Sequence, residues 1–242
     1  MEAIKTENLT KKYRDLVAVD NVNLVIEQGE LFSLLGVNGA GKTTMIKMLS
    51  CLTSPTSGDA HIMGYSILSD EMKVKSVIAL SPQETAVAPN LSVKENLEMI
   101  CGISGFSKEK QRQKLNELSL ELGLGDVLNK KAGKLSGGWQ RRLSIAMALI
   151  CEPEVLFLDE PTLGLDVIAR SELWHTIRSL KGRVTIILTT HYMEEAEALS
   201  DRIGIMKDGR IVAVGTAQEL IKRTATDRFE NAFIRIIKEE GL

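Results

Sequence analysis

One glycine-rich stretch, Leu34–Thr44, has the residue types and the spacing to bind phosphate. It fits the pattern G-x-x-x-x-G-K-[ST], in which a loop joins a buried strand to the N-terminus of a helix. Glycines let the backbone approach phosphates without a Cβ clash, and free N–H groups and the helix dipole then face the anion. Lys42 should reach the β- and γ-phosphates of a nucleotide, and the Thr43 hydroxyl should bind Mg²⁺. The predicted phosphate-binding residues are Gly36, Asn38, Gly39, Ala40, Gly41, Lys42, Thr43 and Thr44.

Two acidic residues follow another apolar strand. Val155–Leu158 leads directly into Asp159 and Glu160. A carboxylate at a strand end beside a phosphate-binding loop is where an Asp helps to hold Mg²⁺, and the adjacent Glu160 can accept a proton from an attacking water. A solvated acidic turn is the alternative for an isolated Asp-Glu pair. The four apolar residues before it and the phosphate-binding loop favour the catalytic interpretation.

Two more polar residues follow predicted buried strands. His191 comes after Val184–Leu188, where a histidine can point at the γ-phosphate. Gln83 comes after Val77–Leu80 and could contact Mg²⁺ or the attacking water, although a lone glutamine also fits an ordinary surface position.

A second glycine-rich stretch, Leu135–Arg142, opens another predicted helix with Ser136, Gly137 and Gly138. A serine hydroxyl and exposed N–H groups at a helix N-terminus make an anion site, although Ser-Gly-Gly alone is more often an N-cap in a turn. The chain then has two phosphate cradles and one set of catalytic carboxylates. The second cradle is therefore predicted to serve a nucleotide held by another copy of the chain.

The elements that position these residues follow an α/β pattern with a helical block inside it. In the first part we predict strands at Ala3–Leu9, Val22–Ile26, Leu31–Leu35, Asp59–Met63 and Val77–Leu80, a loop at Lys11–Asp15 and a helix that runs from the phosphate-binding loop to near Ser54. In the block from Ser92 to Cys151 we predict helices at Glu95–Ile103, Lys108–Leu122 and Gly138–Ile150, the first behind a capping box at Ser92–Glu95.

The α/β pattern resumes after the block. We predict helices at Asp166–Lys181, Tyr192–Leu199 and from Thr216, strands at Val155–Leu158 and Val184–Leu188, and a hairpin at Arg202–Val214. The segment Asp227–Lys238 has apolar residues at helical spacing and predicts an amphipathic final helix packed on the body of the protein.

Composition narrows the class of protein. The chain has 242 residues, enough for one large α/β domain, and a net charge of −2, which gives no electrostatic argument for nucleic acid. Its three cysteines are far apart and form no C-x-x-C pair, so neither a disulfide framework nor a zinc site is indicated. No apolar run of 18 residues and no signal peptide is present, so we expect a soluble protein of the reducing cytosol that could dock on a membrane protein.

The order of these motifs resembles the ATP-binding cassette ATPases over roughly residues 2–220. The resemblance rests on Gly36–Thr44, Gln83, Leu135–Gln140, Asp159–Glu160, Leu165–Asp166 and His191. It implies a P-loop NTPase (RecA-like) α/β core with an N-terminal antiparallel β part and a helical subdomain inserted at about residues 90–151. It also implies a cassette of residues 1–220 followed by a short helical tail, 221–242.

The resemblance also implies roles for single residues. Gly36–Thr44 corresponds to the Walker A loop, Asp159 to the Walker B aspartate, Glu160 to the general base, His191 to the switch histidine and Gln83 to the Q-loop residue that links the site to a transmembrane partner. Ser136, Gly137 and Gly138 would bind the γ-phosphate across a dimer interface, Asp166 would lie in the D-loop between the two sites, and Tyr13 would stack on adenine.

Two positions depart from the commonest family pattern. Trp139 stands where the signature stretch usually has Gln, and Gly164 stands where the D-loop often has Ala. Neither change removes a phosphate ligand, so the site is not interpreted as degenerate. The sequence offers no physical account of Trp139.

The family resemblance implies ATP and Mg²⁺ as ligands, and a second copy of the chain, or a homologous ATPase, as partner. It also implies a transmembrane permease subunit, no nucleic acid, and a position on the inner face of the cell membrane. Thr190–Ala196 and the hairpin near Gly209 are similar to those of bacterial drug and lipid exporters with separate ATPase subunits. The roughly 20 residues after Leu220 cannot form the regulatory domain that many sugar importers carry, which also favours an exporter. The alternatives are an importer-type ATPase, a cassette ATPase that moves no solute and a regulator that does not hydrolyse nucleotide.

Overall fold

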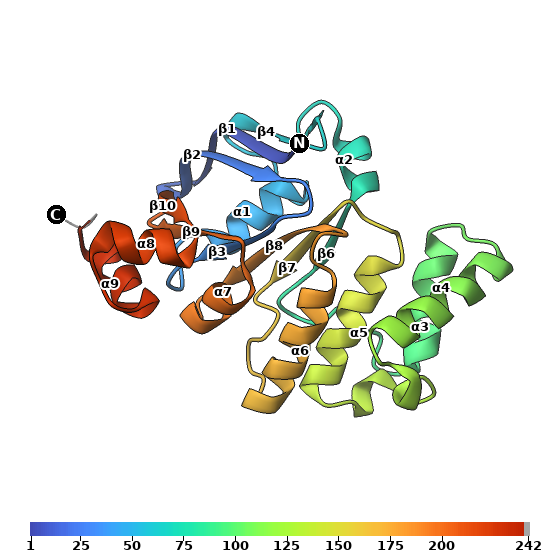
Figure 1. The fold of residues 1–242 in the computed structure, drawn as a ribbon. Coiled ribbons are helices and arrows are strands. Elements are labelled where there is room, and N and C mark those ends of the chain that lie inside the picture. Colours follow the sequence, from blue (N-terminus) through green and yellow to red (C-terminus); the bar gives the residue numbers. More distant parts are fainter. Residues whose placement is uncertain (240–242) are drawn as a thin grey trace.

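Two β-sheets lie on either side of helix α1 (Lys42–Leu49) in the computed structural model, which describes residues 1–239 (Figure 1). The first sheet is antiparallel and joins, in the order β2-β1-β4-β5, the strands Leu16–Glu27, Glu2–Tyr13, Ser57–Ile62 and Tyr65–Ser66. The second joins, in the order β10-β9-β3-β8-β7-β6, the strands Arg210–Gly215, Arg202–Lys207, Leu31–Leu35, Thr185–Thr190, Val155–Asp159 and Ile78–Ser81. The apolar side chains of α1 pack against both sheets in one buried cluster.

The central strands of the second sheet are parallel, and β3, β8 and β7 are buried at every position, which fits the apolar runs at their centres. Their pairing places Leu35 beside Thr190, Asp159 beside Thr189 and Ser81 beside Leu158. The carboxyl ends of β3, β6, β7 and β8 therefore meet at one edge, where ligands bind in open α/β sheets. A buried strand was predicted at Val77–Leu80. The strand is present as β6, but its expected burial was wrong, because β6 is an edge strand and is only partly buried.

Helices cover the other face of this sheet. Helices α5 (Gly137–Leu149), α6 (Val167–Ser179) and α7 (Met193–Leu199) pack there, and their apolar residues share a cluster with β7 and β8 (Figure 1). The side chain of Asp166 caps α6, and α5 begins directly after Ser136. The motifs that contain Ser136 and Asp166 therefore lie at the starts of two helices that cover this face of the sheet.

The helical block has an apolar core of its own. Helices α3 (Val93–Ile103) and α4 (Lys108–Glu121) and two 3₁₀ turns (Gly125–Val127 and Ala132–Lys134) pack against one face of α5. The predicted capping box is present, since the Ser92 hydroxyl accepts from the Glu95 N–H and the Glu95 carboxylate accepts from the Ser92 N–H. The block lies to one side of the sheet, as an inserted helical subdomain (Figure 1).

The opposite end of the molecule holds α8 (Ala217–Thr224) and α9 (Phe229–Glu239). Phe229, Ala232 and Ile236 are buried against α7, α8, β9 and β10, which confirms that the amphipathic final segment packs on the body. The division at residue 220 stays a prediction, and this position falls inside α8. Residues 240–242 of the predicted tail lie outside the described residues.

Two local expectations need correction, and two elements were missed. Tyr13 is the last residue of β1 and not part of a loop, because β1 and β2 extend to a tight turn in which Arg14 has a φ of 51°. Helix α1 ends at Leu49 and not near Ser54, because Cys51 adopts a φ of 54°. Helix α2 (Glu71–Val77) and β5 were not predicted. Between residues 1 and 239 no helix has both the length and the apolar character needed to cross a membrane.

Candidate active site

The phosphate-binding loop follows β3 and ends where α1 begins at Lys42. Its close fit explains the glycines. A Cβ at Gly36 would lie 2.4 Å from the carbonyl oxygen of Met206, and a Cβ at Gly41, whose φ is 104°, would lie 2.3 Å from that of Ala18. Any larger residue at either position would have to displace backbone from β9 or β2.

Lys42 lies inside this loop with 6% of its surface exposed. Its ammonium donates hydrogen bonds to the carbonyl oxygens of Gly36 (2.8 Å) and Val37 (3.3 Å) and lies 3.3 Å from Glu160 Oε1. A buried ammonium beside free loop N–H groups is suited to bind the β- and γ-phosphates.

Thr43 and Asp159 supply hard oxygen ligands side by side. The Thr43 hydroxyl lies 3.3 Å from Asp159 Oδ1, which also accepts a hydrogen bond of 2.5 Å from the Thr189 hydroxyl. No group of three or more His, Cys, Asp or Glu side chains able to hold a metal occurs among residues 1–239. One carboxylate and one hydroxyl beside a phosphate site suit Mg²⁺, which is usually bound by few protein ligands together with substrate phosphates and water.

Glu160 links the phosphate-binding loop to His191. Its second oxygen, Oε2, lies 2.6 Å from His191 Nδ1. Its backbone has a φ of 49°, and its N–H donates to the carbonyl and hydroxyl oxygens of Thr189. A non-glycine residue in this left-handed region is uncommon and is found where the surroundings hold it. The carboxylate is thereby fixed between an ammonium and an imidazole.

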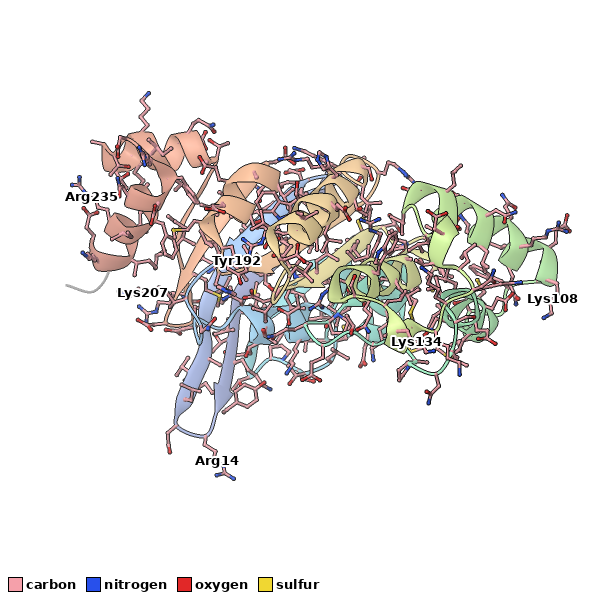
Figure 2. All side chains as sticks on the ribbon, turned by 90° about the horizontal axis from the view of Figure 1, so that it is seen from below. Arg14, Lys108, Lys134, Tyr192, Lys207 and Arg235 are labelled. Atoms are coloured by element: carbon pink, nitrogen blue, oxygen red, sulfur yellow. The ribbon has the colours of Figure 1, made fainter. Side chains whose placement is uncertain are left out.

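A cavity of about 670 Å³ opens above these residues, between the phosphate-binding loop, the β1–β2 hairpin and the β9–β10 turn. It is lined by Tyr13, Leu16, Val17, Ala18, Asn38, Gly39, Ala40, Gly41, Lys42, Thr43, Thr44, Gln83, Glu160, Leu163, His191, Asp208 and Gly209. Tyr13 and Gln83 therefore share one cavity with the predicted catalytic residues. In Figure 2 the hairpin that carries Tyr13 projects from the body, with Arg14 at its tip.

Sequence reasoning missed the lining residues from β2 and from the β9–β10 turn. The hairpin at Arg202–Val214 was predicted with its turn near Gly209, yet nothing in the sequence shows where that turn packs. In the fold, Gly209 donates its N–H to the carbonyl of Ala40 (3.0 Å). The turn thus supports the phosphate-binding loop from outside.

The second glycine-rich stretch does not line this cavity. Ser136 and Gly137 are exposed, and the Ser136 hydroxyl makes no capping hydrogen bond to α5 in the part of the chain that the structure describes. Ser136 therefore presents its hydroxyl and the start of α5 to the outside of the molecule.

The start of α5 packs tightly against the start of α6. A Cβ at Gly138 would lie 3.0 Å from Ala169 Cβ, and a Cβ at Gly137 would lie 3.4 Å from the side chain of Leu165. Asp166 is exposed, and its carboxylate accepts from the N–H groups of Ile168 and Ala169 (2.9 Å each). Its predicted part in nucleotide binding stays a prediction, since these bonds cap α6.

The structure shows what Trp139 contacts. Its ring packs on the apolar core of the helical block, and the guanidinium of Arg142 lies 4.5 Å from the ring centroid. Arg142 also pairs with Glu172 of α6 (3.1 Å). Trp139 thus covers a cation that ties α5 to α6.

Comparison with known proteins agrees with this arrangement. A family model described as ABC transporter matches residues 19–163. The chain is 39% identical over 243 residues to a probable multidrug ABC transporter ATP-binding protein of Escherichia coli (strain K12), a match that covers 98% of this chain and 42% of that protein. It is 40% identical over 229 residues to a daunorubicin resistance ATP-binding protein of Streptomyces coeruleorubidus, covering 94% of this chain and 72% of that protein.

A solved structure of a dimeric ATP-binding cassette, in a post-hydrolysis state and bound to ADP and Pi, has the same fold. It matches with a TM-score of 0.78 and 29% identity over 88% of this chain and 98% of that one. The chain spans less than half the length of the Escherichia coli relative, at 42%. Because the family model covers more than half of the chain and the relatives align over nearly all of it, the chain belongs to the ABC transporter family.

Proposed function

We propose that the chain binds ATP with Mg²⁺ and hydrolyses it, as the ATP-binding subunit that powers export of a solute through a separate transmembrane permease. The observation that carries the proposal is the line of contacts through Glu160. Its two carboxylate oxygens contact Lys42 (3.3 Å) on one side and His191 (2.6 Å) on the other, at the wall of a cavity of about 670 Å³.

The chain's own residues take distinct parts in the reaction. Lys42 and the loop N–H groups bind the β- and γ-phosphates, and Tyr13 stacks on the base. Glu160 accepts a proton from the water that attacks the γ-phosphorus, and the bond from phosphorus to the β-phosphate oxygen breaks to release ADP and phosphate. His191 holds Glu160 Oε2 in place, and Gln83 contacts the attacking water or the metal. Mg²⁺, when held by Thr43 and Asp159, neutralises charge on the phosphates.

The second half of each site comes from another cassette. None of Ser136, Gly137 and Gly138 lines the cavity, and Ser136 and Gly137 are exposed, so we infer that they contact a nucleotide held by another chain. A head-to-tail pair of cassettes, either two copies of this chain or one copy with a homologous ATPase, brings Ser136 of one subunit to the phosphates held by the other. The dimeric state of the similar ADP-bound cassette supports this arrangement.

Export is favoured by the relatives. Those named above are a probable multidrug transporter subunit and a drug resistance protein. A subunit of this kind acts at the inner face of the membrane, bound to a permease that senses the Gln83 loop and the helical block.

The test is the substitution Glu160→Gln, which keeps the shape of the side chain and removes its basicity. We expect the variant to bind ATP, to release no phosphate above background and to run as a stable dimer with ATP on a sizing column. The matched control is Glu154→Gln, at the exposed position directly before β7, which should hydrolyse ATP like the unaltered chain. Full hydrolysis by the Glu160 variant would remove this residue as the base.

A further inference from the structure

Three residues on one face of α6 contact α7 or Tyr192, the residue directly before α7. Arg170, Trp174 and Arg178 are spaced four residues apart and so share a helix face. The Arg170 guanidinium lies 4.4 Å from the ring centroid of Tyr192, Trp174 Nε1 donates to Glu195 Oε1 (3.0 Å), and Arg178 Nη2 donates to the carbonyl of Ala198 (2.8 Å). The two helices are therefore joined at three successive levels.

The first of these levels reaches the candidate active site. The ring of Tyr192 lies 4.1 Å from the ring of His191, centroid to centroid, at an interplanar angle of 40°. His191 in turn lies 2.6 Å from Glu160 Oε2. Because the imidazole is 26% exposed, burial alone does not fix its orientation. Glu160 on one side and Tyr192 on the other are the contacts that hold it.

Arg170 acts on Tyr192 rather than as an ion-pair partner. Among residues 1–239 it forms no ion pair within 4.0 Å, and its buried Nε has no hydrogen-bond partner there. Arg170, Glu194 and Glu197 line one cavity of about 490 Å³. Neither glutamate forms an ion pair with Arg170 among the described residues. The stacking contact on Tyr192, which lies in the middle of the molecule in Figure 2, is therefore the specific interaction of this guanidinium.

Arg170 also belongs to the first turn of α6. Its backbone N–H donates to the carbonyl of Asp166 (2.9 Å), the residue that caps this helix. A shift of that turn would carry the guanidinium with it, and the stacked Tyr192 ring would follow.

We propose that Arg170 is a positioning residue for hydrolysis: stacked on Tyr192, it holds the His191 ring against Glu160 and ties its orientation to the first turn of α6. This inference rests on the proposed function, in which Glu160 is the base. A cation over an aromatic ring contributes about 0.5–2 kcal/mol, which corresponds to roughly a two- to thirtyfold change in rate when lost.

The test compares Arg170→Met with Arg178→Met in the purified full chain. Both substitutions remove a cation from the same helix face, but only the first contact lies beside His191. We expect Arg170→Met to lower kcat for ATP hydrolysis roughly two- to thirtyfold with KM within about twofold. Arg178→Met should keep kcat and change only the unfolding midpoint. Arg170→Lys should restore part of the rate, because an ammonium can occupy the same place over the ring.

A second substitution separates positioning from general loss of structure. If Arg170 acts through His191, the double variant Arg170→Met/His191→Ala should hydrolyse ATP no more slowly than His191→Ala alone. Losses that multiply in the double variant would overturn the inference, as would an unchanged kcat for Arg170→Met. If His191→Ala itself keeps full activity, the proposed role of His191 fails instead.

A spectroscopic measurement covers the case in which rates are too low to compare. The chain has three histidines, so the imidazole signals of ¹⁵N-labelled protein can be assigned with His191→Ala. The His191 signal should move in Arg170→Met and Tyr192→Leu, and should stay in place in Arg178→Met. An unmoved signal in a folded Arg170→Met or Arg170→Lys variant would contradict the inference.

Discussion

The two glycine-rich stretches of this chain, Leu34–Thr44 and Leu135–Arg142, are built in opposite ways. The loop before α1 is enclosed, with Lys42 buried and its glycines pressed against the backbone of β2 and β9. The stretch before α5 is open, with Ser136 and Gly137 exposed and its hydroxyl making no capping bond to the helix in the described residues. An enclosed loop can bind a ligand by itself. An open stretch can contact a ligand from one side only, so it forms a complete site only when another molecule supplies the other contacts.

The same contrast holds for the residues behind each stretch. Behind the enclosed loop, Glu160 contacts both His191 (2.6 Å) and Lys42 (3.3 Å). Asp159 accepts a hydrogen bond of 2.5 Å from the Thr189 hydroxyl. Behind the open stretch, Trp139 packs α5 against the helical block, and Arg142 connects α5 to α6. The first arrangement suits chemistry on a bound phosphate, and the second suits transmission of position between subunits.

The largest expected effect is that of Lys42→Ala on nucleotide binding. The substitution removes a buried ammonium that faces the phosphates, and hydrogen bonds to charged groups contribute about 1.5–3 kcal/mol, so Kd for ATP should rise roughly 10- to 100-fold. Calorimetry on the isolated chain measures this directly. An unchanged Kd would mean that the enclosed loop does not bind the phosphates.

Ser136→Ala should have a smaller effect of a different kind. Because Ser136 lies outside the cavity, ATP binding to the isolated subunit should be unchanged, while ATP-dependent dimerisation should weaken on the order of 10-fold, with one lost bond at each of two sites. Analytical ultracentrifugation with ATP, in the Glu160→Gln background, gives the dimerisation constant. A loss of ATP binding in the isolated subunit would contradict the division into two halves.

The smallest expected effect is that of Trp139→Gln, which gives this position the residue commonest in the family. Loss of the ring beneath Arg142 should weaken dimerisation about two- to tenfold and lower the free energy of unfolding by about 1 kcal/mol. Trp139→Phe keeps an aromatic face and serves as the control. Equal dimerisation constants for the unaltered chain and both variants would mean that Trp139 plays no part in dimerisation.

The enclosed half of the site could be predicted from the sequence because its residues follow strands. Apolar runs such as Val155–Leu158 identify buried parallel strands, and the carboxyl ends of such strands meet at one edge. Asp159, Glu160 and His191 could therefore be placed near Lys42 before the fold was known. The distances between these residues and the left-handed backbone of Glu160 could not be predicted, because they depend on packing between distant segments.

Contacts between elements without such a pattern escaped prediction. The packing of Gly209 on Ala40 and of Arg170 on Tyr192 joins residues far apart in the chain, and no periodicity marks either pair. Tyr13 was assigned to a loop at Lys11–Asp15, whereas β1 continues to Tyr13 through register shifts against β2 that the sequence does not show. Helix α2 has one buried residue, Val74, and so carries little helical pattern.

The most direct test of a site shared between two chains is to mix Lys42→Ala and Ser136→Ala proteins. In a mixed head-to-tail pair one site carries both defects and the other carries none. Each variant alone should hydrolyse ATP at a small fraction of the normal rate. An equal mixture should recover about a quarter of it, because half of the pairs are mixed and each mixed pair holds one intact site of two. No recovery on mixing, with both variants folded and able to pair, would mean that each site is completed within a single chain.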